Sequence, residues 1–267
     1  MAPLVRAAGA PANEHLPIAP SFRLDGRRAL VTGAGRGIGR ACAAAFAQAG
    51  ADVTLVARST GEIEAAAAAI RDGGGTARAS TLDISDLIAV AGFFEDRAAF
   101  HIVLNNAGTN RPMPMMQVLE ADYDAVLDLN VKSTFFVAQH AAKAMVRDGV
   151  RGTLIHMGSQ MGHVGGPNRS LYCASKWAIE GMSKAFSLDL AAHGIRSNTI
   201  APTFIETPMT RPYLEDLKFK ADVLSRIKLG RLGTVEDLMG AAIFLASDAS
   251  SLVTGTSLVV DGGWTAD

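Results

Sequence analysis

A glycine-rich segment at residues 32–39 constrains the fold of this chain more than any other feature. It reads Thr-Gly-Ala-Gly-Arg-Gly-Ile-Gly, follows an apolar run at 29–32 and opens an alanine-rich stretch at 37–49. Glycines at such a strand-to-helix turn allow a tight bend and let free helix N–H groups approach a phosphate. The segment therefore predicts a βα unit that binds a pyrophosphate. A glycine-rich turn without a ligand is the alternative.

The rest of the chain continues this alternation of short aliphatic or β-branched runs with longer helical stretches, which is typical of βαβ units. The predicted strands are 29–32, 53–57, 76–82, 101–105, 153–157, 196–201 and 257–260. The clearest predicted helices are 37–49, 61–71, 121–147 and 171–192. Near-continuous apolar strands suit a sheet that is buried on both faces. The pattern predicts an α/β protein with one seven-stranded parallel sheet and helices on both faces.

No internal repeat and no break in composition divides the sequence into two domains. We expect a flexible N-terminal leader over residues 1–20, which holds four prolines, and a single domain over 21–267. The stretch at about 203–233 lacks a clear strand and contains Pro208 and Pro212. Such a stretch in an α/β enzyme is typical of a mobile lid over the substrate site.

Composition and charge argue against several classes of partner. Hydrophobic residues make up 49% and charged residues 19%, which suits a globular domain. The net charge of -1 gives no basic field for a phosphate backbone, so we expect no nucleic-acid partner. The sequence holds no signal peptide pattern and no membrane-length apolar run, so we expect a cytoplasmic protein without membrane association. Cys42 and Cys173 lack neighbours at metal-ligand spacing, and we expect no metal site.

Motifs in a fixed order give the chain a family resemblance. Gly33, Gly37 and Gly39 form G-x-x-x-G-x-G, residues 105–108 read Asn-Asn-Ala-Gly, and residues 172–176 read Tyr-Cys-Ala-Ser-Lys. Together these motifs resemble those of the short-chain dehydrogenase/reductase (SDR) family. The resemblance implies a single-domain Rossmann fold. It also implies an NAD(P)-dependent oxidoreductase that interconverts a secondary alcohol and a ketone.

The end of the second predicted strand bears on the choice of cofactor. Dinucleotide-binding folds often carry an acid there that binds the adenosine ribose, whereas this chain has Ala57 followed by Arg58. Arg36 lies in the glycine turn, so two guanidinium groups are expected to reach a 2′-phosphate. This favours NADP(H), with NAD(H) or two solvated surface arginines as the alternatives. The cofactor-binding residues expected from the turn, the strand end and the resemblance are Gly33, Gly35, Arg36, Gly37, Ile38, Gly39, Arg58, Asp83, Asn106, Ala107, Gly108, Tyr172, Lys176, Pro202, Ile205 and Thr207.

Tyr172 and Lys176 are the central candidates for catalysis. They lie four residues apart in a predicted helix, so their side chains emerge on one face. A nearby ammonium group favours a phenolate, so we expect Lys176 to lower the pKa of Tyr172 from about 10. The resemblance implies that Tyr172 exchanges a proton with the substrate, Ser159 binds the substrate oxygen, and Asn130 holds a water that links Lys176 to solvent. An ordinary surface pair is the alternative for Tyr172 and Lys176.

Two other classes of protein use α/β folds of this kind. A serine hydrolase needs its nucleophile in Gly-x-Ser-x-Gly, but Ser159 lies in Gly-Ser-Gln-Met-Gly at 158–162, which has a different spacing. A non-catalytic dinucleotide-binding sensor would be expected to lack an intact Tyr-Lys pair, and this chain has both residues. The sequence therefore favours an enzyme over both.

The substrate is constrained only by weaker signals. The resemblance is nearest to polyol and sugar-acid dehydrogenases of the gluconate type, with 3-oxoacyl carrier-protein reductases as the alternative. The candidate pocket residues are Asn110, Arg111, Gln160, Met161, His163 and Phe204. This largely polar set suits a small hydroxylated ketone or alcohol. A carrier protein would need a basic surface, for which only Arg111, Arg169 and Arg211 are candidates.

The sequence departs from the family pattern at two places. Thr203 stands where the family usually has glycine, and the segment at 83–105 is short for the family, which suggests a trimmed helix. Family members usually form homotetramers through the helices that correspond to those around Asn130 and Tyr172. The apolar character of Trp177 in that region permits the same assembly here, although a role in the core is equally compatible.

Overall fold

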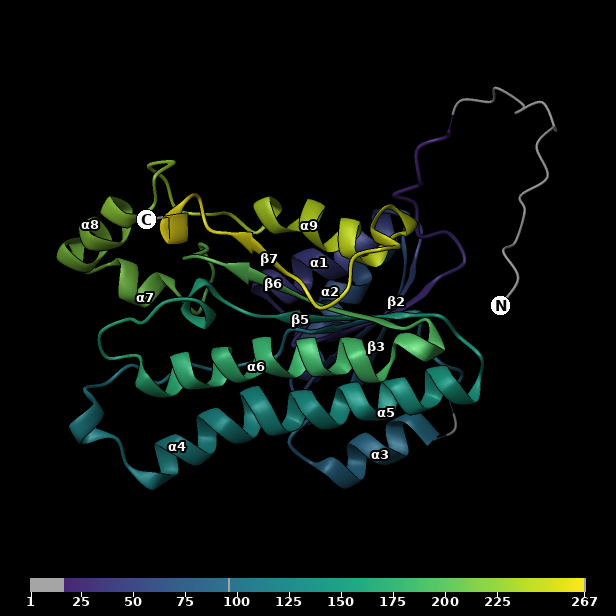
Figure 1. Ribbon diagram of the computed structural model, residues 1–267, viewed down its shortest axis with the longest axis horizontal. Coiled ribbons are helices and arrows are strands. Elements are labelled where there is room, and N and C mark those ends of the chain that lie inside the picture. Colours follow the sequence, from purple (N-terminus) through teal and green to yellow (C-terminus); the bar gives the residue numbers. More distant parts are fainter. Residues whose placement is uncertain (1–16, 96, 267) are drawn as a thin grey trace, which may run out of the picture.

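The computed structural model describes residues 17–95 and 97–266, and it contains one seven-stranded parallel sheet (Figure 1). The strand order is β3-β2-β1-β4-β5-β6-β7, with the crossover between β3 and β4 reversing the direction of winding. The strands are β1 Arg28–Thr32, β2 Asp52–Ala57, β3 Thr76–Thr81, β4 Ile102–Asn105, β5 Thr153–Met157, β6 Arg196–Pro202 and β7 Ser257–Val260. Every predicted strand is present, with ends that differ by at most one residue. The predicted α/β class is confirmed.

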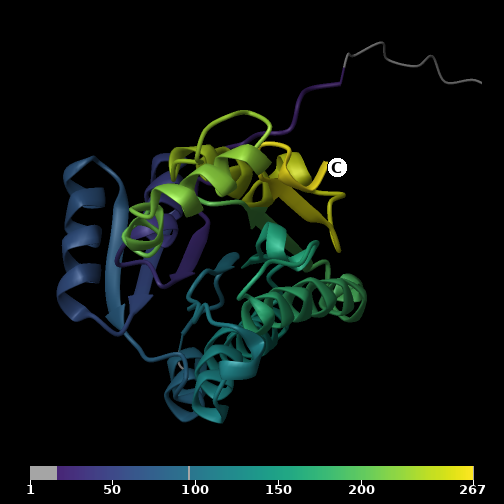
Figure 2. The same ribbon diagram turned by 90° about the vertical axis from the view of Figure 1, so that its left-hand side faces the viewer.

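Helices cover both faces of this sheet, as the apolar strands require. On one face lie α1, α2 and α9, and on the other lie α3, α5 and α6 (Figures 1 and 2). The helices of the two layers are α1 Gly37–Gln48, α2 Thr60–Asp72, α3 Leu87–Glu95, α5 Thr134–Arg147, α6 Ser170–Asp189 and α9 Glu236–Ala246. α3 has nine residues, consistent with the short helix expected before β4.

Each helical layer encloses its own hydrophobic core against the sheet. Phe46 of α1 and Leu55 of β2 are fully buried in the first core, and Leu104 of β4 also belongs to it. Met145 of α5 and Leu154 of β5 are fully buried in the second. Burial of a large apolar side chain stabilises a fold by about 1.5–3 kcal/mol. These two cores hold the strands in register, and so fix the strand ends where the site is built.

The predicted helical stretch over 121–147 is helical throughout, but part of it is not a regular α-helix. The structure has α4 at Glu120–Leu127, a π-helical segment at Asp128–Ser133 and α5 at Thr134–Arg147. Single π turns inside helices are rare and occur often at functional sites. The π turn contains Asn130, whose buried side chain bonds to the backbone of Thr109. The apolar spacing of the sequence runs through this segment, and therefore did not reveal it.

The expected lid folds into two short helices beyond the end of β6. They are α7 at Arg211–Leu214 and α8 at Leu217–Arg226, and both lie at one end of the molecule in Figure 1. Buried Leu214 and Val223 from these helices pack with Trp264 near the C-terminus. The predicted lid is thus an ordered helical cover in this structure, and its mobility stays a prediction.

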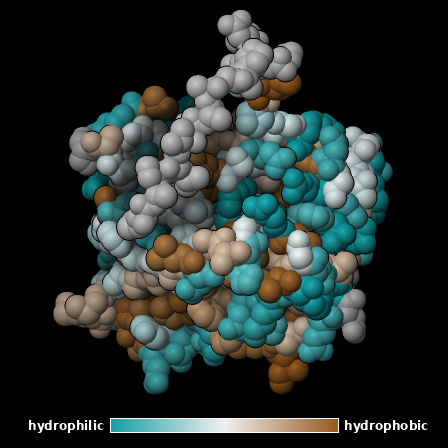
Figure 3. All heavy atoms as spheres, turned by 45° about the vertical axis from the view of Figure 1, so that its right-hand side comes forward, coloured by the Kyte–Doolittle hydropathy of each residue, from teal (hydrophilic) through white to brown (hydrophobic). Residues whose placement is uncertain are grey.

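The N-terminal leader falls largely outside the described residues, which begin at residue 17. From there the chain is exposed until Leu24, which is buried and bonds through its N–H to the carbonyl of Ala49. Figure 3 shows a face where hydrophilic residues cover much of the surface and smaller hydrophobic groups lie between them. Within residues 17–95 and 97–266, no helix combines the length and the apolar character needed to cross a membrane.

Candidate active site

A cleft of about 570 Å³ opens at the carboxyl ends of the strands. The residues that line it come from the turn after β1, from the ends of β2, β4, β5 and β6, and from α6. All predicted cofactor-binding residues except Gly39 line this cleft, and so do Ser159, Tyr172 and Lys176. Asn130 does not line it. The structure therefore brings together residues that are up to about 170 positions apart in the sequence, because parallel strands end at one edge of a sheet.

The glycine turn is held in place by the loop after β4. Thr32 Oγ1 accepts hydrogen bonds from the N–H groups of Asn106 and Ala107 at 3.0 and 3.1 Å. The Asn106 side chain donates to the carbonyl oxygens of Thr32 and Gly33. A Cβ atom on Gly39 would lie 2.4 Å from Asn106 Nδ2. Gly39 is therefore needed for close packing of the turn, which explains why it does not line the cleft.

The two arginines expected to bind a 2′-phosphate both line the cleft, but each faces a carboxylate. Arg36 Nη1 lies 3.6 Å from Glu62 Oε1, and Arg58 Nη1 lies 3.9 Å from Asp83 Oδ2. Burial pushes the pKa of Asp83 upward, but hydrogen bonds from Ser85 and the charge of Arg58 hold it below its ordinary value. The sequence analysis missed Glu62, which lies on α2 and lines the same part of the cleft. The one sequence signal for a contact between Glu62 and Arg36 was the place of Glu62 in the first turn of that helix.

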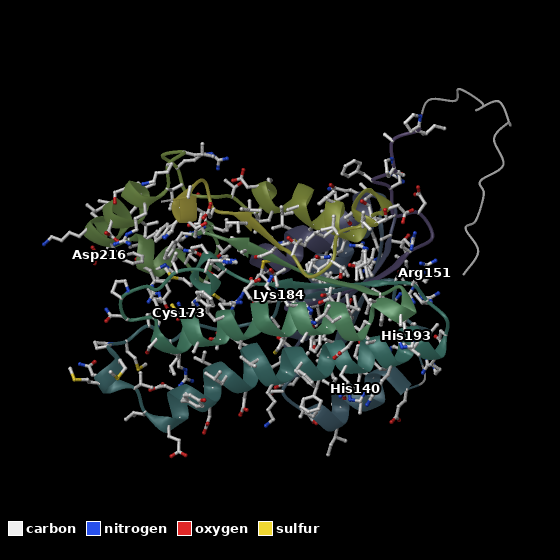
Figure 4. All side chains as sticks on the ribbon, viewed as in Figure 1. His140, Arg151, Cys173, Lys184, His193 and Asp216 are labelled. Atoms are coloured by element: carbon white, nitrogen blue, oxygen red, sulfur yellow. The ribbon has the colours of Figure 1, made fainter. Side chains whose placement is uncertain are left out.

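Tyr172 and Lys176 share one face of α6 at its end near the lid. Figure 4 places Cys173, the next residue after Tyr172, at that end, whereas His193 lies beyond the opposite end. Lys176 Nζ donates a 2.6 Å hydrogen bond to the carbonyl of Met157 and lies 5.5 Å from the centre of the Tyr172 ring. Burial lowers the pKa of Lys176 to about 8, against the opposing charge of Glu180.

The expected lowering of the Tyr172 pKa was wrong for this state of the protein. Burial raises the pKa of the phenol, and the neighbouring Ser159 hydroxyl together with the charge of Arg169 opposes this only in part. The Lys176 ammonium group is directed to the carbonyl of Met157, so it does not offset the desolvation of Tyr172. In this geometry Tyr172 is a protonated phenol at neutral pH.

Ser159 and Asn130 are both buried, and each makes a defined set of hydrogen bonds. The Ser159 hydroxyl donates to Gln160 Oε1 at 2.7 Å and accepts from the N–H of Met161 at 3.1 Å. Asn130 bonds to both backbone groups of Thr109 and donates to Ser175 Oγ at 3.0 Å. The Ser175 hydroxyl in turn donates to the carbonyl of Tyr172. Asn130 therefore connects the loop after β4 to the first turns of α6.

None of the candidate substrate residues lines the cleft directly, and two of them have other partners. His163 Nε2 lies 2.9 Å from Ser257 Oγ and 3.7 Å from Glu180 Oε1, so it points toward β7. Arg111 Nη1 forms a 2.7 Å ion pair with Asp122. The other four candidates are sequence neighbours of residues that line the cleft. Gln160 and Met161 follow Ser159, and Phe204 packs in the apolar cluster under the lid. The side-chain oxygen of Asn110 is buried without a hydrogen-bond partner among the described residues.

The cleft contains features that fit a dinucleotide. The Thr203 hydroxyl, which replaces the expected glycine, lines the cleft and is buried without a hydrogen-bond partner in the described part of the chain. A Cβ on Gly37 would approach only Thr207, at 3.5 Å, so the backbone there is open to a ligand. Across residues 17–95 and 97–266, no three His, Cys, Asp or Glu side chains gather closely enough to hold a metal ion.

Comparisons with known proteins agree with this site. A family model described as Enoyl-(Acyl carrier protein) reductase matches residues 33–265. The chain is 35% identical to D-erythrulose reductase of Gallus gallus over 92% of this chain and 98% of the relative. It is 37% identical to gluconate 5-dehydrogenase of Gluconobacter oxydans (strain 621H) over 91% of this chain and 96% of the relative.

A solved structure of the same fold provides a third comparison. It is a gluconate 5-dehydrogenase from Burkholderia cenocepacia J2315 in complex with NADP and tartrate. The TM-score is 0.88 at 38% identity, and the match covers 92% of this chain and 98% of that one. With the glycine turn, the Tyr-Lys pair and the strand order already established, these matches have one consequence: the chain belongs to the short-chain dehydrogenase/reductase family and is an oxidoreductase.

Proposed function

We propose that this protein interconverts a secondary alcohol and a ketone on a small sugar, polyol or sugar acid, with NADP(H) as its cofactor. The observation that carries the proposal is the arrangement of a single cleft. The glycine turn and two arginines lie at one end, whereas Ser159, Tyr172 and Lys176 lie at the other. A dinucleotide bound along the cleft would bring its nicotinamide to the polar groups that handle the substrate oxygen.

The residues that would hold the cofactor follow from their places in the cleft. The backbone from Gly33 to Ile38 would bind the pyrophosphate, because it precedes α1 and exposes helix N–H groups. Arg36 and Arg58 would exchange their carboxylate partners for the 2′-phosphate, which favours NADP(H) over NAD(H). Pro202, Ile205 and Thr207 would contact the nicotinamide side. The Burkholderia relative contains NADP, which supports this choice.

The adenosine side would be formed mainly by the loop after β4 and the end of β3. Asn106, Ala107 and Gly108 line the cleft there, and Asp83 would bind the adenine amino group. Its carboxylate already accepts bonds from the N–H and the hydroxyl of Ser85, which fix its orientation. The family pattern assigns this role to these four residues, and all four line the cleft.

The proton chemistry would be carried out by Tyr172. When bound, the nicotinamide supplies or accepts the hydride. In reduction, Tyr172 donates its proton to the developing alkoxide, and the raised pKa of the phenol keeps that proton in place at neutral pH. Ser159 would stabilise the charge on the substrate oxygen by hydrogen bonding. Lys176 would bind the ribose and restore the proton of Tyr172, and Asn130 would hold a water that links Lys176 to solvent.

The structure bears on the choice between a small hydroxylated substrate and an acyl group on a carrier protein. The matching family model describes an enoyl-(acyl carrier protein) reductase, so reduction of an acyl group on a carrier protein is the alternative function. However, Arg169 is buried and Arg111 is paired with Asp122. Of the three arginines, this leaves Arg211 as the exposed one without an ion pair in the described part of the chain. The gluconate and erythrulose enzymes among the relatives support the small substrate.

One assay tests the proposal. Polyols, keto-sugars and sugar acids are compared with acetoacetyl thioesters, using NADPH, NADP, NADH and NAD, while the nicotinamide absorbance is followed. We expect turnover of at least one small hydroxylated substrate with the NADP(H) couple and a lower kcat/KM for the thioesters. A clear preference for thioesters would favour carrier-protein reduction. Tight NADPH binding without turnover of any substrate would favour a non-catalytic sensor.

We also propose a homotetrameric, cytoplasmic protein. Exposed apolar side chains on α4 and α6 support the assembly, because Tyr123 is 52%, Trp177 53% and Leu188 79% exposed in the single chain. Such groups are typical of surfaces that pack against another subunit. Sedimentation velocity should show a tetramer at micromolar concentration, and a monomer would contradict the proposal. Its location is tested by fractionation of the source cells.

A further inference from the structure

Arg169 is a buried cation beside the candidate active site. It lies one residue before α6, and only 8% of its surface is exposed. Its guanidinium carbon lies 5.8 Å from the centre of the Tyr213 ring and 5.9 Å from that of Phe219. Both rings belong to the lid helices, Tyr213 to α7 and Phe219 to α8. The lid therefore covers an arginine that the loop sequence alone would place at the surface.

No carboxylate compensates this charge in the described part of the chain. Arg169 has no ion pair and no side-chain hydrogen bond there, and the groups whose charge acts on it are Tyr213, Tyr172 and Cys173. Aromatic faces attract a guanidinium group, but they do not accept its N–H donors, and no other group in the described residues accepts them. An arginine remains protonated when it is buried, so the cost of burial can be offset only by an anion or by acceptors.

The position of Arg169 relative to the reacting atoms suggests which anion this is. Arg169 caps the N-terminus of α6, three positions before Tyr172, so both residues belong to the end of α6 near the lid. The positive charge of Arg169 acts on the Tyr172 phenol and partly opposes the rise of its pKa. The stem of Arg169 also packs on the loop before α6, since a Cβ on Gly166 would lie 3.4 Å from its Cγ. An anion bound at this guanidinium would therefore lie under the lid helices, at the end of α6 that carries Tyr172.

We propose that Arg169 is a specificity-determining residue that binds the carboxylate of a small hydroxy acid or keto acid. The inference rests on the proposed function, and it narrows the substrate class from sugars and polyols in general to sugar acids. Arginine binds a carboxylate through two parallel hydrogen bonds, and this fixes the orientation of the substrate chain. Tyr213 and Phe219 would close over the ion pair and exclude water, which strengthens it.

The first test compares matched substrates that differ only in the carboxylate. D-gluconate is paired with D-glucitol, D-arabinonate with D-arabinitol, and D-threonate with D-threitol. We expect the acid to have the higher kcat/KM in at least one pair. The Arg169→Gln variant should lose about 100-fold on that acid, because truncation leaves a desolvated carboxylate without its partner. Its kcat/KM for the neutral alcohols should not fall by a comparable factor, because they have no carboxylate to lose, and Arg169→Lys should recover part of the loss on the acid.

A matched control and a stability measurement separate this role from a structural one. Arg211→Gln removes an exposed arginine from the same lid and should change neither substrate class by more than about twofold. Since Arg169 has no internal acid partner, Arg169→Met should leave the melting temperature of the protein unchanged or raise it. A structural role would lower it. Equal losses on acids and alcohols in Arg169→Gln, or equal activity on both in the wild type, would overturn the inference.

Binding distinguishes failure of this inference from failure of the proposed function. Isothermal titration calorimetry measures D-gluconate and D-glucitol against the NADPH complex of the wild type and of Arg169→Gln. If gluconate binds the wild type selectively and loses about 100-fold in the variant, the carboxylate site stands even where no substrate is turned over. If alcohols are turned over but both proteins bind gluconate equally weakly, the proposed function stands and the carboxylate site is wrong.

Discussion

The two ends of the cleft use arginine in opposite ways. At the adenosine end, Arg36 and Arg58 are largely exposed, and each already has a carboxylate partner. Beside the substrate end, Arg169 does not line the cleft; it is buried and has no carboxylate partner among the described residues. Water screens the first two pairs, so their formation and exchange cost little. Burial makes the third charge expensive unless a ligand balances it.

This difference indicates how each end selects its ligand. An exposed pair of arginines can accept a phosphate by changing partners, which gives a graded preference between NADP(H) and NAD(H). A buried arginine without an acid instead penalises a neutral ligand, because the neutral ligand leaves the charge unbalanced. The adenosine end should therefore discriminate weakly and in a salt-dependent way, and the substrate end strongly and with little dependence on salt.

The largest effect should come from the substrate end, with Tyr172→Phe. Loss of the phenolic proton should lower kcat by about 10²–10⁴-fold, the range of general acid catalysis. The affinity for NADPH, measured by fluorescence titration, should stay within about twofold, because the other residues that would bind the cofactor are unchanged. A folded variant that keeps more than a few per cent of wild-type turnover would remove Tyr172 from the proposed role.

A second prediction contrasts Arg169 with His156, a buried side chain that can lose its charge. Burial lowers the pKa of His156 to about 4 from 6.5, and its ring nitrogens lie 3.3 Å from Asn105 Nδ2 and Ser197 Oγ. Between about pH 4 and pH 6.5 the unfolded chain therefore binds a proton at His156 that the folded protein does not bind. The stability from this residue is complete above pH 6.5 and is lost as the pH falls toward 4, up to about 3 kcal/mol at 1.36 kcal/mol per pKa unit.

Urea unfolding at a series of pH values measures this loss. In His156→Gln the amide can still form hydrogen bonds but does not titrate, so stability should fall less steeply between pH 6.5 and 4 than in the wild type. His193→Gln changes an exposed histidine and is the matched control. If the slopes of the wild type and His156→Gln agree, His156 is not the buried neutral group that the structure indicates.

What the sequence could predict depends on whether the residues in contact lie near one another in the chain. The strands and the glycine turn were predicted because their signals are local: apolar runs define strands, and glycine spacing defines the turn. The contacts of Tyr172 and Lys176 followed from helical spacing. The partners of Arg36 and Arg58 could not be predicted, because Glu62 and Asp83 meet them only after α2 and β3 have packed.

The burial of Arg169 depends on still more distant contacts. It follows Pro167 and Asn168, a sequence typical of an exposed loop, and the rings of Tyr213 on α7 and Phe219 on α8 cover it. The direction of the His163 side chain could not be predicted for a related reason, since its partner Ser257 is on the last strand. Side-chain direction in loops depends on elements that fold against them, and no local pattern contains that information.

At the adenosine end we expect a smaller effect from Arg58→Ala. The variant should bind NADPH about tenfold more weakly, equal to about 1.4 kcal/mol, and bind NADH almost unchanged. The effect should shrink as the ionic strength rises, because 74% of the Arg58 side chain is exposed. Fluorescence titration with both cofactors at low and high salt measures this. Equal losses for NADPH and NADH would show that Arg58 does not recognise the 2′-phosphate.

The smallest effect should come from Glu62, which competes with the cofactor for Arg36. Glu62 Oε1 lies 3.6 Å from Arg36 Nη1 at the cleft wall, so its carboxylate both neutralises the arginine and repels a phosphate. Glu62→Gln should therefore bind NADPH about two- to fivefold more tightly, the range expected for one exposed charge pair, and leave NADH nearly unchanged. Glu64→Gln on the same helix removes the same charge outside the residues that line the cleft and serves as the control. Because exposed charges are screened, the difference between the two variants should disappear at high salt. Weaker NADPH binding in Glu62→Gln would mean that the pair positions Arg36 for the phosphate instead of competing with it.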